Sequence, residues 1–303
     1  MRNLPGSSRD FYGYGSALPS VKWPNQHRVA VSFVLNFEEG GEFSMTDGDS
    51  RNESIYEVID SQVSPDQCID SHFEYGTRTA YWRISELFAL HGMHYTLSAC
   101  GQAVERSPWL AQHAVSQGHE VSAHGWRWQK SIDLSPDDEL EAILKTSETI
   151  KRVTGLAPRG WHTRSNPSPN TRRLLVQNGF LYDSDAYNDD TPYILQIEGR
   201  PHVVLPYAFD TNDMQFQNTQ RFGTGDDFAD YVCAAFDWLW REGADKPRML
   251  SIGLHLRMIG RPGRIGALER IMKHIQARGQ AWITTREHIA QHWLSSLSNP
   301  SKP

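Results

Sequence analysis

The chain has 303 residues, of which 39% are hydrophobic and 22% charged, proportions typical of a soluble globular protein. Its formal net charge of −6 argues against a nucleic-acid or acidic-membrane partner, because either favours a basic face. Three widely spaced cysteines, no apolar N-terminal stretch of signal-peptide length and no run of 18 apolar residues predict a protein of the reducing cytoplasm.

Apolar, β-rich runs alternate with amphipathic helical patterns along most of the chain. The predicted strands are 28–37, 95–99, 119–123, 159–163, 202–209, 248–255 and 280–285, and the predicted helices are 77–92, 135–155, 226–243 and 264–279. The strands read as continuous apolar runs, which is typical of a parallel sheet covered on both faces. Seven such units predict an α/β fold: a distorted (β/α) barrel of seven or eight parallel strands in a single domain, 1–303, with 1–25 as an N-terminal extension packed on it.

Polar residues gather at the ends of five predicted strands, in NFEEGGE, HGWRW, WHTRSN, DTND and HLRMIGRPGR. Such clusters can be ordinary solvated loops. The carboxyl ends of barrel strands, however, meet at one mouth, where the active sites of these folds lie. We therefore expect the five clusters to converge on one site.

One pair of glutamates and one glutamate–arginine pair stand near predicted strand and helix ends. Glu38 and Glu39 are neighbours, so they point to opposite sides of an extended strand, and both face a pocket only if the strand bends there. Either of them is a candidate general base. Glu74 and Arg78 precede a helix and are candidates for substrate binding, with a structural ion pair as an equally weighted alternative.

The remaining candidates are histidines, arginines and tryptophans of the later clusters. His124 at a strand end could ligate zinc, but the indole of Trp128, four residues on, cannot. Arginines beside tryptophan suit planar, carbonyl-rich or anionic groups. The candidates of this kind are Arg159, Trp161, His162 and Arg164 in one cluster, and His255 and Arg257 in another.

The succession NFEEGG, GHEVSAHGWRW, PRGW, LYDSDAYNDDTPY and LHLRMIGRPGR resembles the polysaccharide deacetylase (NodB-homology) superfamily, and within it the branch of cofactor-independent bacterial allantoinases. The resemblance implies a distorted β/α barrel that hydrolyses carbon–nitrogen bonds other than peptide bonds. The superfamily motif Thr-Phe-Asp-Asp-Gly supplies a base and a metal ligand, and the motif His-Ser/Thr-x-x-His supplies two further ligands. Here Glu38 and Glu39 replace the aspartates and Trp128 replaces the second histidine, so the resemblance implies a site with no metal ligand and no cofactor.

One segment departs from that branch. Its Gly-Trp-Tyr-Thr-Gly-Arg pattern reads GWHTRSNPSPN in this chain, with His162 in place of tyrosine and one residue inserted. The departure concerns the substrate and leaves the reaction type unchanged.

The expected function is the opening of a cyclic amide or ureide such as allantoin by water. Glu38 or Glu39 would be the base, Arg159 or His124 would stabilise the oxyanion, and His255 would protonate the leaving nitrogen. The expected substrate-binding residues are Glu74, Arg78, Trp128, Trp161, His162, Arg164 and Arg257.

Two other functions remain open from the sequence. One is a metal-dependent N-deacetylase of a sugar or peptidoglycan fragment, in which Glu39 and His124 help to hold zinc. The other is a catalytically inactive barrel that serves as a binding module. As partners we expect a small-molecule substrate and further copies of the chain in a homo-oligomer (dimer or tetramer), with neither nucleic acid nor membrane.

Overall fold

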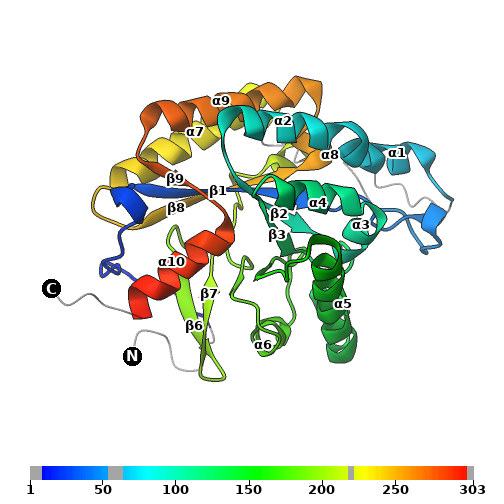
Figure 1. The fold of residues 1–303 in the computed structure, drawn as a ribbon, viewed down its shortest axis with the longest axis horizontal. Coiled ribbons are helices and arrows are strands. Elements are labelled where there is room, and N and C mark those ends of the chain that lie inside the picture. The colour runs from blue at the N-terminus through cyan, green and yellow to red at the C-terminus, as the bar shows by residue number, and fades with distance from the viewer. Residues whose placement is uncertain (1–8, 54–63, 218–221, 299–303) are drawn as a thin grey trace.

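The protein is built around one sheet that curls into an incomplete barrel, with helices on its outside (Figure 1). The computed structural model describes residues 9–53, 64–217 and 222–298. The strands of this part are β1 (Val29–Phe37), β2 (Tyr95–Ala99), β3 (Glu120–Ala123), β4 (Gly160–Trp161), β5 (Tyr182–Asp183), β6 (Tyr193–Ile197), β7 (Arg200–Val204), β8 (Arg248–His255) and β9 (Ala281–Ile283).

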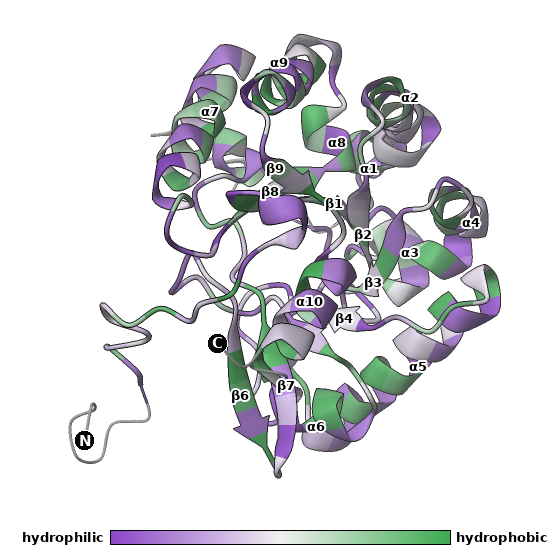
Figure 2. Cartoon of the chain, turned by 60° about the vertical axis from the view of Figure 1, so that its left-hand side comes forward, coloured by the Kyte–Doolittle hydropathy of each residue, from purple (hydrophilic) through white to green (hydrophobic). Residues whose placement is uncertain are grey.

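The α-helices of the described part follow or precede these strands. They are α1 (Gln67–Tyr75), α2 (Tyr81–His91), α3 (Gly101–Arg106), α4 (Pro108–Ser116), α5 (Pro136–Thr154), α6 (Thr171–Gln177), α7 (Gly225–Glu242), α8 (Leu256–Ile259), α9 (Pro262–Arg278) and α10 (Arg286–Ser298). The longer helices turn green, apolar stripes toward the sheet and purple stripes outward, as amphipathic packing requires (Figure 2).

The strand order is β6-β7-β5-β4-β3-β2-β1-β8, with β9 also paired to β1. Every described strand runs parallel to its neighbour except β6, which forms an antiparallel hairpin with β7. This confirms the predicted distorted barrel of parallel strands in one α/β domain. The central strand is β1, whose nine residues are all buried.

The register of the parallel strands places their carboxyl ends at one level. Phe37 pairs with Ala99, Ala99 with Ala123, and Ala123 with Trp161. On the other side of β1, Asn36 pairs with His255. The residues that follow these pairs, Glu38, His124 and His162, are therefore brought with His255 to the same mouth of the barrel, where parallel barrels place their active sites.

Several predicted elements are shorter in the structure. The predicted strand 159–163 is reduced to β4, and 202–209 ends at Val204. The predicted helix 77–92 is split into a π-helical segment, Gly76–Ala80, and α2. A π-helical turn often marks a functional site, and here Gly76 lies so close to Glu39 that a Cβ atom at Gly76 would overlap the carboxylate.

The described part of the N-terminal extension, from residue 9 on, contacts the barrel. The Tyr14 hydroxyl donates to the carbonyl of Pro192, and the indole of Trp23 donates to the carbonyl of Arg248. Residues 1–8 of the predicted extension lie outside the described residues.

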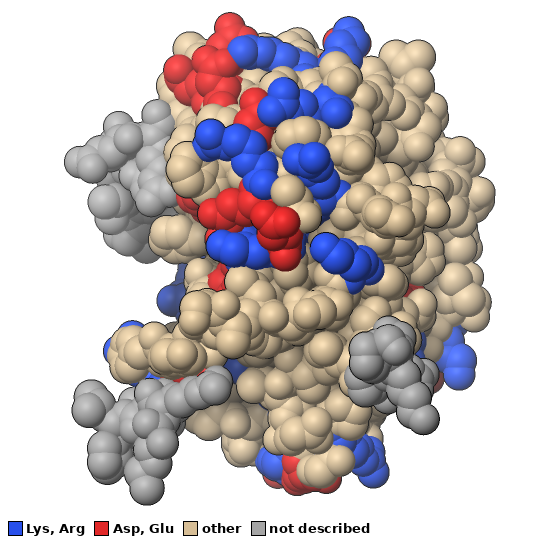
Figure 3. Space-filling model, turned by 90° about the vertical axis from the view of Figure 1, so that its left-hand side faces the viewer, with Lys and Arg blue, Asp and Glu red and all other residues tan. Residues whose placement is uncertain are grey.

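The outer helices carry charges of both signs. Arg270 on α9 forms ion pairs with Asp226 and Asp230 on α7. On the face shown in Figure 3, basic and acidic side chains are intermixed over the upper part of the molecule. No helix among residues 9–53, 64–217 and 222–298 is long and apolar enough to cross a membrane.

Candidate active site

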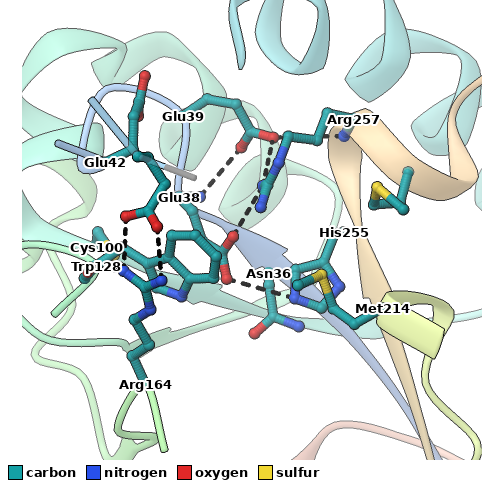
Figure 4. A network of polar contacts seen from close by, with 12 residues as sticks. Asn36, Glu38, Glu39, Glu42, Cys100, Trp128, Arg164, Met214, His255 and Arg257 are labelled. Atoms are coloured by element: carbon teal, nitrogen blue, oxygen red, sulfur yellow. Dashed lines mark hydrogen bonds and ion pairs between the residues drawn. The ribbon is translucent and has the colours of Figure 1, made fainter. Parts of the chain in front are cut away.

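Both glutamates that follow β1 are buried beside one guanidinium. Glu38 is fully buried and Glu39 is 3% exposed. Arg257, the second residue of the short helix α8 after β8, brings Nη1 to 2.8 Å from Glu38 Oε2 and 3.3 Å from Glu39 Oε1 (Figure 4). Because β1 ends at Phe37, the backbone turns and the Glu38 amide donates to Glu39 Oε2 at 3.1 Å. The strand thus bends where the sequence required it to bend.

Two histidines approach the other oxygen of Glu38. The Nε2 atoms of His124 and His255 each lie 3.4 Å from Glu38 Oε1. The Nδ1 of His124 is 2.6 Å from the carbonyl oxygen of His162, an acceptor, which places a proton on that nitrogen and turns Nε2 toward Glu38. The site therefore combines a carboxylate with two imidazoles that point at the same oxygen.

Asp213 orients His255 and was not singled out by the sequence. Its Oδ1 is 2.6 Å from His255 Nδ1, and its Oδ2 accepts the backbone N–H groups of His255 and Ile259 at 2.8 and 3.1 Å. It stands in the DTND cluster, which marked the right strand end but not the residue. Nothing in the sequence indicated that this aspartate, some 40 residues earlier in the chain, pairs with the histidine.

The charges around Glu38 and His255 shift the pKa values of these two groups in opposite directions. Burial raises the pKa of Glu38, but the charges of His255 and Arg257 and hydrogen bonds from both histidines hold it well below its ordinary value. Burial lowers the pKa of His255, but the carboxylates of Glu38 and Asp213 outweigh it and raise that pKa to about 9. At neutral pH the pair is therefore a carboxylate next to an imidazolium.

We expect turnover to fall as the pH rises through about 9, because His255 then loses the proton that it would give to a leaving group. A histidine with a raised pKa also stabilises the fold fully below its unfolded pKa, and this contribution disappears as the pH rises through about 9. Asp213→Asn should move the alkaline limb of the kcat/KM profile down by about 1–3 pH units, because it removes the negative charge that faces the His255 ring.

The matched control for this prediction is Asp210→Asn, since Asp210 accepts a hydrogen bond from the exposed Tyr231 and has no contact with His255 among the described residues. Identical alkaline limbs in wild type and Asp213→Asn would contradict the assignment of His255 as the proton donor.

Glu39 and Glu42 extend the acidic side of the site. Burial raises the pKa of Glu39, and Arg257 opposes that rise. Burial raises the pKa of Glu42 to about 7. Both line a cavity of about 240 Å³ that Glu74 also reaches. Three nearby carboxyl groups thus titrate differently, and Glu38 is the one held ionised.

Trp128 forms a wall of the site together with Arg164. The Arg164 guanidinium lies 3.6 Å from the Trp128 ring centroid, and Arg257 lies 5.2 Å from the same centroid. Arg164 is held in place by two hydrogen bonds to Glu53, of 2.7 and 2.8 Å, and by one to the carbonyl of Trp128. Glu53, which sequence reasoning missed, is the partner that fixes this wall.

His162 lies within the site as predicted. Its ring stacks on His124 at 4.7 Å between centroids and contacts Tyr207 at 4.3 Å. Burial and the neighbouring His124 lower the pKa of His162 well below its ordinary value, so its ring is neutral. Its Nδ1 is buried and has no hydrogen-bond partner among the described residues.

Four predicted site residues lie outside the cluster around Glu38, although one of them, Glu74, lines the same cavity as Glu39. Arg159 is exposed and precedes β4, at the strand end opposite to the mouth. Trp161 points into the core, where it packs against Phe180 and donates to Thr163. Strand alternation explains this orientation of Trp161: His162 faces inward, so its neighbour faces the helices.

Glu74 and Arg78 form an exposed ion pair of 3.2 Å along the helix, which is the structural alternative that the sequence left open for that motif.

The deacetylase metal does not fit the residues present. A zinc site needs three or four donors, and Trp128 stands where the resemblance would place one of them. Arg257 already occupies the space between the two glutamates with a positive charge. Across the described residues, no group of three or more His, Cys, Asp and Glu side chains is arranged to hold a metal ion. That the protein works without a cofactor remains a prediction.

A parallel α/β barrel with an acid–base cluster at the carboxyl ends of its strands has its candidate active site where barrel enzymes have theirs. The family model described as polysaccharide deacetylase matches residues 61–180. A putative polysaccharide deacetylase of Schizosaccharomyces pombe is 38% identical over 97% of this chain and 99% of its own length. The chain therefore belongs to the polysaccharide deacetylase family.

Two solved structures are similar over nearly the whole chain. The crystal structure of Puue allantoinase superposes with a TM-score of 0.91 at 42% identity, covering 98% of this chain and 99% of its own. A probable polysaccharide deacetylase from Pseudomonas aeruginosa PAO1 superposes with a TM-score of 0.91 at 40% identity, covering 98% and 100%. The resemblance to the superfamily is thus confirmed, and its allantoinase-like branch is consistent with these neighbours.

Proposed function

We propose that this protein opens a cyclic amide or ureide, allantoin or a close relative, by hydrolysis of a carbon–nitrogen bond without a catalytic metal. The observation that carries the proposal is the guanidinium of Arg257 in contact with both Glu38 and Glu39. In this arrangement the chain itself supplies the cation that would otherwise come from a metal. The 42% identity to an allantoinase supports the substrate class.

In the proposed reaction Glu38 takes a proton from water. The water oxygen attacks the substrate carbonyl carbon, and the His124 ring, whose Nε2 lies 3.4 Å from Glu38 Oε1, holds that carboxylate in position. The imidazolium of His255 lies on the same oxygen of Glu38, so it stabilises the developing oxyanion and then protonates the leaving ring nitrogen. The proton on Glu38 returns to the histidine, and the site is restored.

The low pKa of Glu38 makes it a weak base alone, and the surroundings compensate for this. Trp128 and the stacked His162 exclude water, and in such an environment oriented charges act more strongly than in bulk solvent. His162 offers a neutral imidazole, which can donate to a carbonyl or accept from an N–H group of a ureide ring.

The alternative is a metal-dependent N-deacetylase. The relative from Schizosaccharomyces pombe is described as a putative polysaccharide deacetylase and the Pseudomonas aeruginosa protein as a probable one, which favours deacetylation. To separate the two, the purified protein is analysed for metal and assayed with allantoin, hydantoins, cyclic imides and N-acetyl sugars, before and after chelation. We expect ring opening that a chelator leaves unchanged. Activity that is lost on chelation and recovered with zinc, or acetate release from an N-acetyl sugar, would contradict the proposal.

A further inference from the structure

The strand β6 is an unpaired edge of the sheet. It is the last strand in the sheet order and bonds to β7 alone. The β6–β7 hairpin lies at the margin of the molecule in both ribbon views (Figures 1 and 2). Within the described residues, no backbone group outside the hairpin bonds to the outer edge of β6. In this part of the chain the outward N–H and C=O groups of β6 therefore have no backbone partner.

The hairpin geometry decides which groups face outward. The turn residues Glu198 and Gly199 have φ angles of 50° and 74°, the positive values of a two-residue type I′ turn. In such a hairpin the flanking pair, Ile197 and Arg200, exchanges both hydrogen bonds, and the bonded pairs then alternate along the strand. Ile194 and Gln196 are accordingly the residues whose N–H and C=O groups point away from β7.

Nothing on β6 protects this edge. Soluble proteins usually cover an edge strand or place lysine, proline or a bulge on it. The segment Tyr193–Ile197 reads YILQI, without a charged residue or a proline, and β6 is coloured mostly as hydrophobic in Figure 2. Its side chains are only half-buried except Gln196, which is exposed. An edge of this kind is a template for strand pairing.

We propose that β6 pairs antiparallel with β6 of a second copy of this chain, about a two-fold axis through Leu195. In this register Ile194 of one copy lies opposite Gln196 of the other, so that both outward-facing residues of each strand are bonded. The two Leu195 side chains then meet on the axis, and Ile197 of each copy lies opposite Tyr193 of its partner.

A second copy is the occupant that the strand itself favours. The pairing is isologous, as a closed dimer requires, and it places no like charges opposite each other because the segment carries none. The marginal position of the hairpin lets two copies approach edge to edge, so that the two sheets become continuous across the dimer. A foreign strand could use the same backbone groups, and this is an outcome of the test.

The register is tested by disulfide crosslinking. Cys68 is exposed and Cys233 half-buried, so both are first replaced by serine, whereas Cys100 is buried and is kept. Residues opposite each other in a non-bonded antiparallel pair have Cα atoms about 4.5 Å apart, within the range of about 4.4–6.8 Å that a disulfide spans. Leu195→Cys should crosslink into a dimer on mild oxidation, and Gln196→Cys, which lies opposite Ile194, should not.

The pairing itself is tested by sedimentation equilibrium. Gln196→Pro removes an outward N–H group without breaking the hairpin, so it should raise the dimer dissociation constant by at least about tenfold, with circular dichroism unchanged. Gln196→Ala keeps the N–H group and should remain dimeric. A wild-type protein that is monomeric at tens of micromolar, or equal crosslinking of the two cysteine variants, would overturn the proposal.

Discussion

Replacing Glu38 by glutamine is expected to lower kcat by about 10²–10⁴-fold, the usual contribution of a general base. The amide keeps the shape of the carboxyl group but can neither accept a proton from water nor balance the charges of Arg257 and His255. Turnover is measured on the cyclic amide that the wild type opens, with circular dichroism at the assay temperature to show that the variant is folded.

Arg159→Ala is the matched control for this experiment. The sequence placed Arg159 in the pocket, but the structure leaves it exposed at the amino end of β4, so its removal should change kcat less than about twofold. Normal turnover in Glu38→Gln would show that another group is the base. A large loss in Arg159→Ala would return that arginine to the site.

The barrel could be predicted because its strands and long helices are marked by local sequence patterns. The longer strands of the sheet read as short apolar runs, and the long helix α5 begins with the side-chain cap Ser135. The β6–β7 hairpin was not predicted, because its turn, Glu198-Gly199, is not one of the dipeptides that mark type I′ turns most strongly. The short length of β4 could not be predicted from the sequence, because it depends on the register in which β4 pairs with β3 and β5.

The positions of candidate residues could be predicted where they stand at the end of a strand or within two residues after it. Glu38, Glu39, His124, His255 and Arg257 lie together in the structure because the carboxyl ends of parallel strands converge. The partners that orient them, Asp213 and Glu53, come from loops, whose paths depend on tertiary packing. Arg159 and Trp161 were misplaced for other reasons: Arg159 precedes β4 at the end away from the mouth, and Trp161 faces the opposite side of the sheet from His162.

Arg257 links the sequence changes of this chain to its proposed chemistry. Two buried glutamates side by side would raise each other's pKa, and one of them would be protonated. Burial opposes the charge on Arg257, but Glu38 and Glu39 outweigh it and raise the pKa of the guanidinium, which therefore stays charged. The indole of Trp128, in the place of a metal ligand, stands beside that cation. The loss of a ligand and the presence of a buried arginine are consistent with each other.

Arg257→Leu is therefore expected to lower both stability and turnover. Removing one partner of a buried ion pair costs about 3–5 kcal/mol of unfolding free energy, because the remaining charge has no compensation. Without the guanidinium the pKa of Glu38 rises, so less of the base is ionised at neutral pH. A carboxylate with a lowered folded-state pKa stabilises the fold above its ordinary pKa, and this contribution is lost as the pH falls through the folded-state value. The difference in urea stability between wild type and Arg257→Leu should accordingly be largest at neutral pH and shrink in acid.

Arg257→Lys keeps the charge without the planar fork and should lie between wild type and Arg257→Leu in stability and kcat. An Arg257→Leu protein that unfolds at the wild-type urea concentration and turns over normally would show that the two glutamates are compensated in another way.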